Sequence, residues 1–312
     1  MAAVTAAMVK ELREMTGAGM MDCKKALSAV DGDMDKAVEF LREKGLAAAA
    51  KKASRIAAEG LVKTLVDGDK KAVIVEVNSE TDFVAKNADF QEYVAQVAEQ
   101  AMNTTAADID AFLAEPWALD TTKTVAEELS SKISIIGEKL SIRRFAQVNA
   151  EGGCVVAYTH GGGRIGVLVE AETEVVNDEV KEALKNIAMQ IAALRPQYVS
   201  RDEVSDEFIA HEKEILMAQI MNDPKESAKP EKVIQGMIQG RISKELKDFC
   251  LMDQVYVKAE DGKQTVAQYM QQVSKAVGAP VAVKKFVRFE TGEGMQKKEE
   301  NFAEEVAKQM GM

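Results

Sequence analysis

The sequence predicts an α+β protein: a helical N-terminal module, then a duplicated α+β core with small antiparallel sheets and an inserted helical hairpin. Three observations lead to this prediction. Apolar residues follow a helical period up to about residue 45 and then alternate with polar ones, as in strands. Two glycine-containing turns each separate a pair of apolar runs, which is typical of β-hairpins. The order of hairpin, helix and basic strand then occurs twice along the chain.

Residues 1–46 are predicted to form three short helices, because their apolar residues recur every three or four positions. Glycine-containing stretches at residues 17–19 and 32–33 separate the helices. Residues 47–58 are rich in alanine and lysine and are predicted as a linker. The apolar positions that define the three helices are Val4, Met8, Leu12 and Met15, then Met21, Ala26, Leu27 and Val30, then Met34, Val38 and Leu41.

Residues 59–150 are predicted as the first half of the core. Apolar runs at residues 61–66 and 72–77 flank an Asp-Gly turn, which is a strong β-hairpin signal. Helical periodicity and then alternation follow the hairpin. The elements expected there are a helix at residues 90–101, more helix around residues 125–140, and a basic strand at residues 141–148.

The second half of the core is predicted at residues 151–201 and 250–292, where the same elements recur. Aligning the hairpin turns at Gly68 and Gly162 gives an offset of 94 residues, whereas aligning the two basic strands gives 141. The second copy is therefore 47 residues longer. Its predicted elements are strands at residues 154–159 and 165–170, a helix at residues 180–194, and a basic strand at residues 282–289.

The additional residues are assigned to residues 202–249, which are polar and have a helical period in two arms. Pro224 and Pro230 interrupt this pattern, since proline disfavours helix in the residue before it. We therefore predict a helical hairpin inserted into the second half of the core. Residues 293–312 are predicted as a C-terminal module with an amphipathic helix.

Composition and charge argue against a membrane protein, a secreted protein and a nucleic-acid-binding protein. Hydrophobic residues make up 46% of the 312 residues, yet no apolar run approaches the roughly 18 residues of a membrane helix. No secretory signal pattern opens the chain, and Cys23, Cys154 and Cys250 are predicted as free thiols. A net charge of -11 would repel a phosphate backbone. We therefore expect a cytoplasmic protein that binds neither membranes nor nucleic acid directly.

Motifs that imitate catalytic or cofactor sites lack the required surroundings. Residues 161–166 satisfy the pattern G-x-G-x-x-G, but a strand pattern follows them where a dinucleotide site needs a helix. Asp31, Asp33 and Asp35 imitate the start of a calcium loop, whose required glycine and final glutamate are absent. Neither histidine has a nearby set of cysteines or carboxylates for zinc. We therefore expect no cofactor, no metal site and no enzymatic chemistry.

A large apolar residue stands at an unusual place after the first hairpin. Phe83 follows the second strand in a segment that reads as a loop, where exposed apolar groups more often serve partners than stability. Asp82 is predicted to cap a short helix that begins at Phe83. Met20 and Met21, at a predicted helix start, fit either core packing or a deformable partner-binding surface.

Two motifs carry a resemblance to a known family. The string VKELREMTGAGMMDCKKAL at residues 9–27 and the string TDFVAKN at residues 81–87 closely resemble signatures of elongation factor Ts. Further similarity extends over essentially the whole chain. That family is the exchange factor for the translational GTPase elongation factor Tu (EF-Tu). The resemblance implies a three-helix module of ubiquitin-associated (UBA-like) type, a coiled-coil hairpin, and guanine nucleotide exchange without covalent chemistry.

The resemblance also implies roles for individual residues. His160 lies in the half of the core that would meet a second EF-Tu domain. The stoichiometry is left open, including a dimer or a 2:2 complex with EF-Tu, and a general protein-interaction adaptor without exchange activity is the alternative function. The residues implied to contact the nucleotide domain of EF-Tu are Lys10, Arg13, Met20 and Met21. The segment implied to dislodge magnesium, called the TDFV turn below, consists of Thr81, Asp82, Phe83 and Val84.

Overall fold

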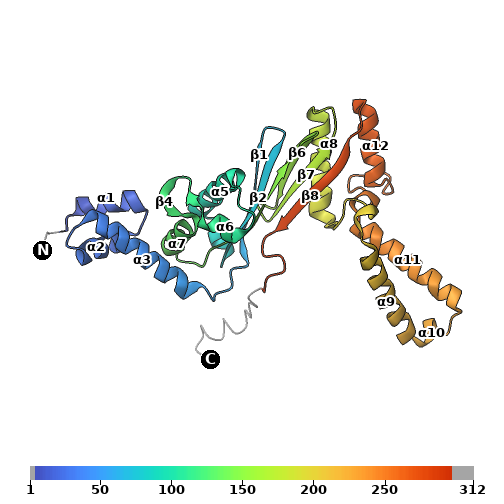
Figure 1. Ribbon diagram of the computed structural model, residues 1–312, viewed down its shortest axis with the longest axis horizontal. Helices are drawn as coiled ribbons and strands as arrows, with labels where there is room; N and C mark the ends of the chain where they lie inside the picture. Colours follow the sequence, from blue (N-terminus) through green and yellow to red (C-terminus); the bar gives the residue numbers. More distant parts are fainter. Residues whose placement is uncertain (1–3, 297–312) are drawn as a thin grey trace.

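The computed structural model describes residues 4–296 of the chain. Three N-terminal helices, two α+β halves and a projecting pair of long helices follow one another along the molecule (Figure 1). Helices combined with small antiparallel sheets confirm the predicted α+β class. Most of the predicted C-terminal module, including Phe302, Val306 and Met310, lies outside the described residues.

The N-terminal module is held together by the apolar faces of its three helices. Leu12, Cys23 and Leu27 are fully buried in its core. Thr5 caps the first helix and Asp33 caps the third, since each side chain accepts a hydrogen bond from a backbone N–H of the first turn. The three predicted helices are therefore present. They are α1 (Ala6–Thr16), α2 (Met20–Ala29) and α3 (Met34–Lys52).

The third helix is longer than the sequence pattern predicts. α3 continues through Lys52, so the first half of the segment predicted as a linker, residues 47–58, is helical. Alanine and lysine are strong helix formers, and Ala49 packs against the core of the first α+β half. Residues 53–58 connect this helix to the first strand.

The first α+β half packs helices against an antiparallel sheet of order β1-β2-β5. Alternate residues of the central strand, Val73, Val75 and Val77, lie in one buried cluster with Phe90 and Trp117. The predicted hairpin and basic strand are confirmed, whereas the short β3-β4 hairpin is an addition. The elements are β1 (Glu59–Asp67), β2 (Lys71–Ser79), α4 (Asp82–Ala85), α5 (Ala88–Asn103), α6 (Ile109–Ala114), β3 (Pro116–Trp117), β4 (Asp120–Thr124), α7 (Val125–Ile136) and β5 (Ser141–Asn149).

The second α+β half repeats this arrangement with a sheet of order β6-β7-β8, again antiparallel throughout. The pairing of the central strand with the basic strand shifts register after Glu76 in the first half and after Glu170 in the second. These two glutamates are related by the offset that aligns the hairpin turns. The predicted repeat is therefore visible in the strand pairing. The elements are β6 (Cys154–His160), β7 (Ile165–Glu172), α8 (Asp178–Leu194), α12 (Val266–Val277) and β8 (Ala282–Glu290).

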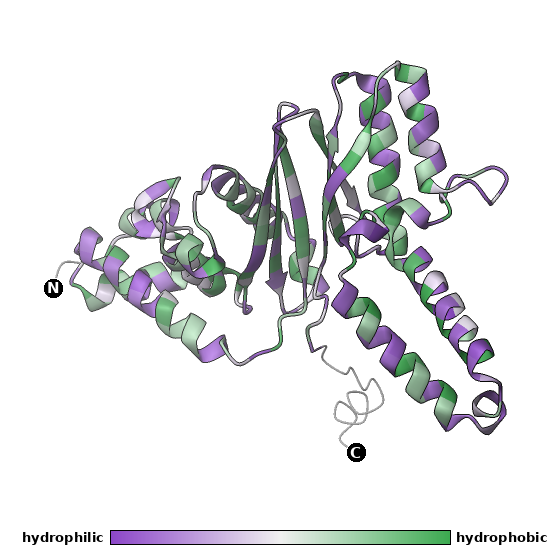
Figure 2. Cartoon of the chain, turned by 45° about the vertical axis from the view of Figure 1, so that its right-hand side comes forward, coloured by the Kyte–Doolittle hydropathy of each residue, from purple (hydrophilic) through white to green (hydrophobic). Residues whose placement is uncertain are grey.

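A pair of long helices occupies the predicted insertion. It projects away from both sheets, and hydrophobic and hydrophilic residues alternate along each helix (Figure 2). Apolar residues from both arms, among them Leu216, Ile220, Ile234 and Ile238, form a separate small core. The segments are the 3-10 helix η1 (Arg201–Glu203), α9 (Asp206–Asn222), α10 (Pro224–Ser227), α11 (Glu231–Phe249) and the 3-10 helix η2 (Leu251–Asp253).

The two sheets pack directly against each other. The backbone N–H of Val62 in β1 donates to the carbonyl of Gly163 at 2.7 Å. Residues of both sheets share a buried cluster that includes Val62, Ile74 and Leu168. Gly166 in β7 lies where the two sheets approach closely, because an added Cβ would stand 2.5 Å from a methyl group of Val62. The two halves therefore form one packed unit at this position.

Replacing Gly166 with alanine is expected to destabilise the protein by about 1–3 kcal/mol, since the new methyl group would overpack the seam between the sheets. The matched control is Gly236→Ala, because nothing lies within 4 Å of a Cβ added at that position in α11. That control is expected to raise stability by up to about 1 kcal/mol through helix propensity. Thermal unfolding of the three proteins checks both values, and equal unfolding temperatures for wild type and Gly166→Ala would contradict the tight packing.

Candidate partner-binding site

The TDFV turn joins β2 to α5 through the four-residue helix α4. Thr81 is the N-cap: its backbone is extended, and its hydroxyl accepts a hydrogen bond from the N–H of Val84 at 3.4 Å. The prediction that Asp82 caps a helix starting at Phe83 was therefore wrong by one residue. The chain leaves the sheet in extended conformation through Thr81, and Asp82 is already the first helical residue.

Phe83 points into solvent from a helix that is anchored on its other side. Its side chain is 81% exposed, the highest value for a large hydrophobic residue within residues 4–296. Ala85 is buried, and the half-buried Val84 packs against the core of the first half. The turn thus presents an aromatic ring outward from a fixed base, as expected for a partner contact.

Asp82 adds a negative charge beside this ring. Its carboxylate accepts a hydrogen bond from Lys86 Nζ at 2.5 Å, one helical turn further on. That hydrogen bond is the main reason why the pKa of Asp82 lies below its usual value. Asp82 is therefore ionised at neutral pH and available as a charged acceptor on the exposed face of the turn.

The backbone that enters the turn is held by a residue that the sequence analysis did not select. Glu138, in the connection between α7 and β5, accepts hydrogen bonds from the N–H groups of Glu80 and Thr81. It is separated from them by more than 50 positions in the sequence. No spacing rule connects residues so far apart, so only the fold identifies Glu138.

The structure brings together the four residues expected to contact a partner from the N-terminal module. Met20 and Met21 are 59% and 61% exposed, so they belong to the surface and the core-packing alternative is excluded. They line a groove of about 380 Å³ with Lys10 and Arg13 from α1. Flexible methionines flanked by cations form a surface that suits an apolar partner with acidic residues at its edge.

His160 lies apart from the other candidate residues. It ends strand β6, and its Nδ1 is 2.9 Å from the hydroxyl of Tyr158. Figure 1 shows α1 and α2 on one side of α5 and α7, with β6 on the other. The structure therefore presents three separate surfaces: the methionine groove (Lys10, Arg13, Met20 and Met21), the TDFV turn and the His160 end of β6.

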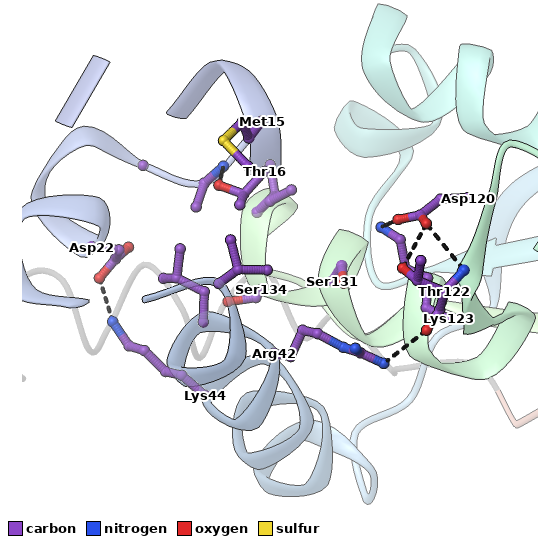
Figure 3. Close-up of a pocket in the computed structure, with 15 residues that line it drawn as sticks. Met15, Thr16, Asp22, Arg42, Lys44, Asp120, Thr122, Lys123, Ser131 and Ser134 are labelled. Carbon is purple, nitrogen blue, oxygen red and sulfur yellow. Dashed lines mark hydrogen bonds and ion pairs between the residues drawn. The ribbon is translucent and has the colours of Figure 1, made fainter. Parts of the chain in front are cut away.

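A small cavity of about 120 Å³ lies between the N-terminal module and the first α+β half (Figure 3). Among its lining side chains, Lys44 pairs with Asp22. Arg42 donates to the backbone carbonyl of Thr122 and to Glu127, which stands outside the lining. Arg42 thereby ties α3 to the start of α7 at 2.7 Å. We interpret this cavity as part of the interface that orients the N-terminal module relative to the first α+β half.

The described residues hold neither a metal-binding cluster nor a membrane-spanning helix. Within residues 4–296, no three side chains of histidine, cysteine, aspartate or glutamate cluster closely enough to hold a metal ion. No helix in that part of the chain is long and apolar enough to cross a membrane. Cys23, Cys154 and Cys250 are buried free thiols, as predicted.

Comparison with known proteins gives a consistent result. A family described as "Elongation factor TS" matches residues 80–293. Elongation factor Ts of Clostridioides difficile (strain 630) is 55% identical over 311 residues, covering 99% of this chain and 100% of that protein. Elongation factor Ts of Clostridium perfringens (strain 13 / Type A) is 53% identical, with 99% of both chains covered. That of Clostridium tetani (strain Massachusetts / E88) is 52% identical, with 98% of this chain and 99% of that protein covered.

Proposed function

Because this chain belongs to the elongation factor Ts family, we propose that it is a guanine nucleotide exchange factor of translation elongation. It binds EF-Tu in its GDP form and promotes release of GDP, so that GTP can take its place. The observation that carries this proposal is the 81% exposed Phe83 on a rigidly held turn. An aromatic ring held outward on an anchored turn is available to insert into a partner.

The TDFV turn is proposed to act as a wedge. Magnesium needs nearly ideal octahedral oxygen geometry, so a small displacement of its ligands or waters removes much of its binding energy. Phe83 inserts between helices of the GTPase and shifts that geometry. Asp82, a carboxylate on the exposed face of the turn, perturbs the loop that holds a magnesium-bound water. Magnesium leaves, and the affinity for GDP falls.

Thermodynamic linkage then completes the cycle. If this protein weakens GDP binding by a given factor, GDP weakens the binding of this protein by the same factor. Rebinding of a nucleotide therefore helps to expel the exchange factor. No covalent bond is made or broken, so the protein acts by binding alone.

The methionine groove and His160 are proposed as additional contacts that hold EF-Tu in place. Replacing Met20 and Met21 together with alanine is expected to raise the concentration for half-maximal exchange roughly tenfold, as loss of a buried interface anchor does. The maximal release rate should stay the same, since the TDFV turn is intact. Met221→Ala on α9 is the matched control, with a methionine of similar exposure, 56%. A lowered maximal rate with unchanged half-saturation would contradict this division of roles.

The proposed function is tested by GDP release from purified EF-Tu loaded with a fluorescent GDP analogue. Adding this protein is expected to accelerate release in a saturable manner. The alternative function, a general adaptor, predicts that the protein binds EF-Tu and leaves the release rate unchanged. Binding measured in the same samples separates these two results from a failure to bind.

A further inference from the structure

We propose that Glu138 is a positioning residue for nucleotide exchange, which fixes the TDFV turn so that Phe83 is presented in one orientation. This inference rests on the proposed exchange function. It concerns a residue outside the turn that touches neither the nucleotide nor the exposed ring.

The carboxylate of Glu138 collects three hydrogen bonds from the entrance of the turn. Its Oε2 accepts from the backbone N–H groups of Glu80 and Thr81, each at 3.1 Å. Its Oε1 accepts from the hydroxyl of Thr81 at 2.7 Å. The bond from the hydroxyl is the shortest of the three, and together they fix both the backbone and the side chain at Thr81.

The hydroxyl of Thr81 shows why the carboxylate matters. A hydroxyl has one proton to donate, and Thr81 gives it to Glu138. Its lone pairs are then free to accept the N–H of Val84, which is the capping bond of α4. Glu138 therefore sets the direction of the capping hydroxyl as well as the path of the backbone.

A reciprocal contact strengthens the same connection. The carboxylate of Glu80 accepts from the backbone N–H of Lys139 at 2.6 Å and from Arg55 Nη1 at 3.2 Å. Lys139 Nζ in turn donates to the carbonyls of Ala53 and Arg55, at 2.7 and 2.8 Å. Each of the two segments, residues 80–81 and residues 138–139, thus supplies a carboxylate that accepts a backbone N–H of the other. Lys139 also holds the chain that leaves α3. The part of the molecule that carries the methionine groove is thereby tied to the part that carries Phe83.

These hydrogen bonds of Glu138 and Glu80 are called the carboxylate brace below. Such a brace is needed because α4 is too short to be stable alone. A single helical turn does not offset the entropy of fixing its backbone. Inserting an aromatic ring into a partner is also more favourable when the ring is already held in its bound orientation, since less ordering accompanies binding. The carboxylate brace holds the ring in this orientation before the protein binds EF-Tu.

The second half of the core offers an internal comparison. After β7, Thr173 stands at the place of Ser79, and its hydroxyl bonds only to Val175, which stands at the place of Thr81. Glu174 stands at the place of Glu80, and within residues 4–296 its exposed carboxylate makes no hydrogen bond or ion pair. Ala279 stands at the place of Glu138, counted by the offset of 141 residues that aligns the two basic strands, so no carboxylate is present there. The carboxylate brace therefore occurs in the half that carries Phe83 and is absent from its repeat.

The test is a double-mutant cycle in the GDP-release assay with the full chain. Glu138→Gln keeps the size of the side chain but replaces one acceptor oxygen with a donor. It is expected to lower the maximal release rate roughly tenfold, as a small misplacement of a functional group does. In a Phe83→Ala background it should have almost no further effect, because Glu138 acts through the ring. Glu174→Gln makes the same chemical change at an exposed glutamate of the repeat and should behave as wild type.

Three outcomes would overturn the inference: unchanged release with Glu138→Gln, additive losses in the double mutant, or unchanged hydrogen exchange at the amides of Glu80 and Thr81. The amide measurement needs no EF-Tu, and we expect faster exchange in Glu138→Gln. If Glu138→Gln does not fold, Thr81→Val removes the hydroxyl bond to Glu138 together with the capping bond from Val84 and leaves the two backbone bonds to Glu138. The same non-additivity with Phe83→Ala is expected. A wild-type protein that fails to accelerate release would instead refute the proposed function.

Discussion

Replacing Phe83 with alanine is expected to reduce the acceleration of GDP release from EF-Tu about 10- to 100-fold, the loss typical of a central aromatic anchor at an interface. The stability of the protein itself should change by less than about 0.5 kcal/mol, because the ring is exposed and its removal leaves no cavity. Stopped-flow release of a fluorescent GDP analogue, at saturating concentrations of each variant, measures the first effect. Thermal unfolding measures the second.

The controls for this prediction separate the ring from its surroundings. Leu119→Ala removes another apolar side chain, 64% exposed in the turn between β3 and β4, and should leave release unchanged. Asp82→Ala should produce a smaller loss than Phe83→Ala, because it removes the charge and leaves the ring in place. Its bond to Lys86 lies on the surface, so its removal should not unfold the turn. Normal release rates with both Phe83→Ala and Asp82→Ala would reject the wedge.

Elements of the fold that depend on local signals could be predicted from the sequence. The Asp-Gly turn and the glycine turn at residues 161–163 each specify a hairpin by themselves, and both hairpins are present. The insertion followed from comparing two repeat offsets, which needs no structural information. The end of α3 could not be placed, because alanine and lysine suit both a linker and a helix. Packing of Ala49 on the first half decides between them.

In the candidate site, too, some residues could be predicted from their sequence neighbours and others depend on the fold. An apolar ring at the end of a strand can be recognised from its immediate neighbours, and Phe83 is indeed exposed. The capping residue was misplaced, since Thr81 and Asp82 are both good N-caps and their backbone angles decide which one acts. Glu138 could not be found at all, because it meets Thr81 only when β5, which follows it, pairs with β2 in the sheet.

Replacing Glu76 with glutamine is expected to destabilise the first half of the core by about 2–4 kcal/mol, as breaking a buried ion pair does. Glu76 is fully buried in the central strand β2, between the two halves. Its carboxylate accepts from Arg143 at 2.9 Å, from Arg144 at 2.6 Å and from the backbone N–H of Gly292 at 2.8 Å. Glutamine keeps the size but removes the charge and one acceptor. Arg143 then loses its carboxylate partner, and Arg144 keeps only the carboxylate of Glu293, at 3.3 Å.

The repeat supplies the matched control for this prediction. Glu170 stands at the corresponding place in β7 and is also buried, but its nearest cation is Lys284 at 3.7 Å, which is itself half exposed. Glu170→Gln should therefore cost no more than about 1 kcal/mol. The fluorescence of Trp117, the only tryptophan, reports unfolding of the first half in urea. Equal shifts of the urea midpoint for Glu76→Gln and Glu170→Gln would show that burial alone sets the effect, and that the paired arginines contribute nothing specific.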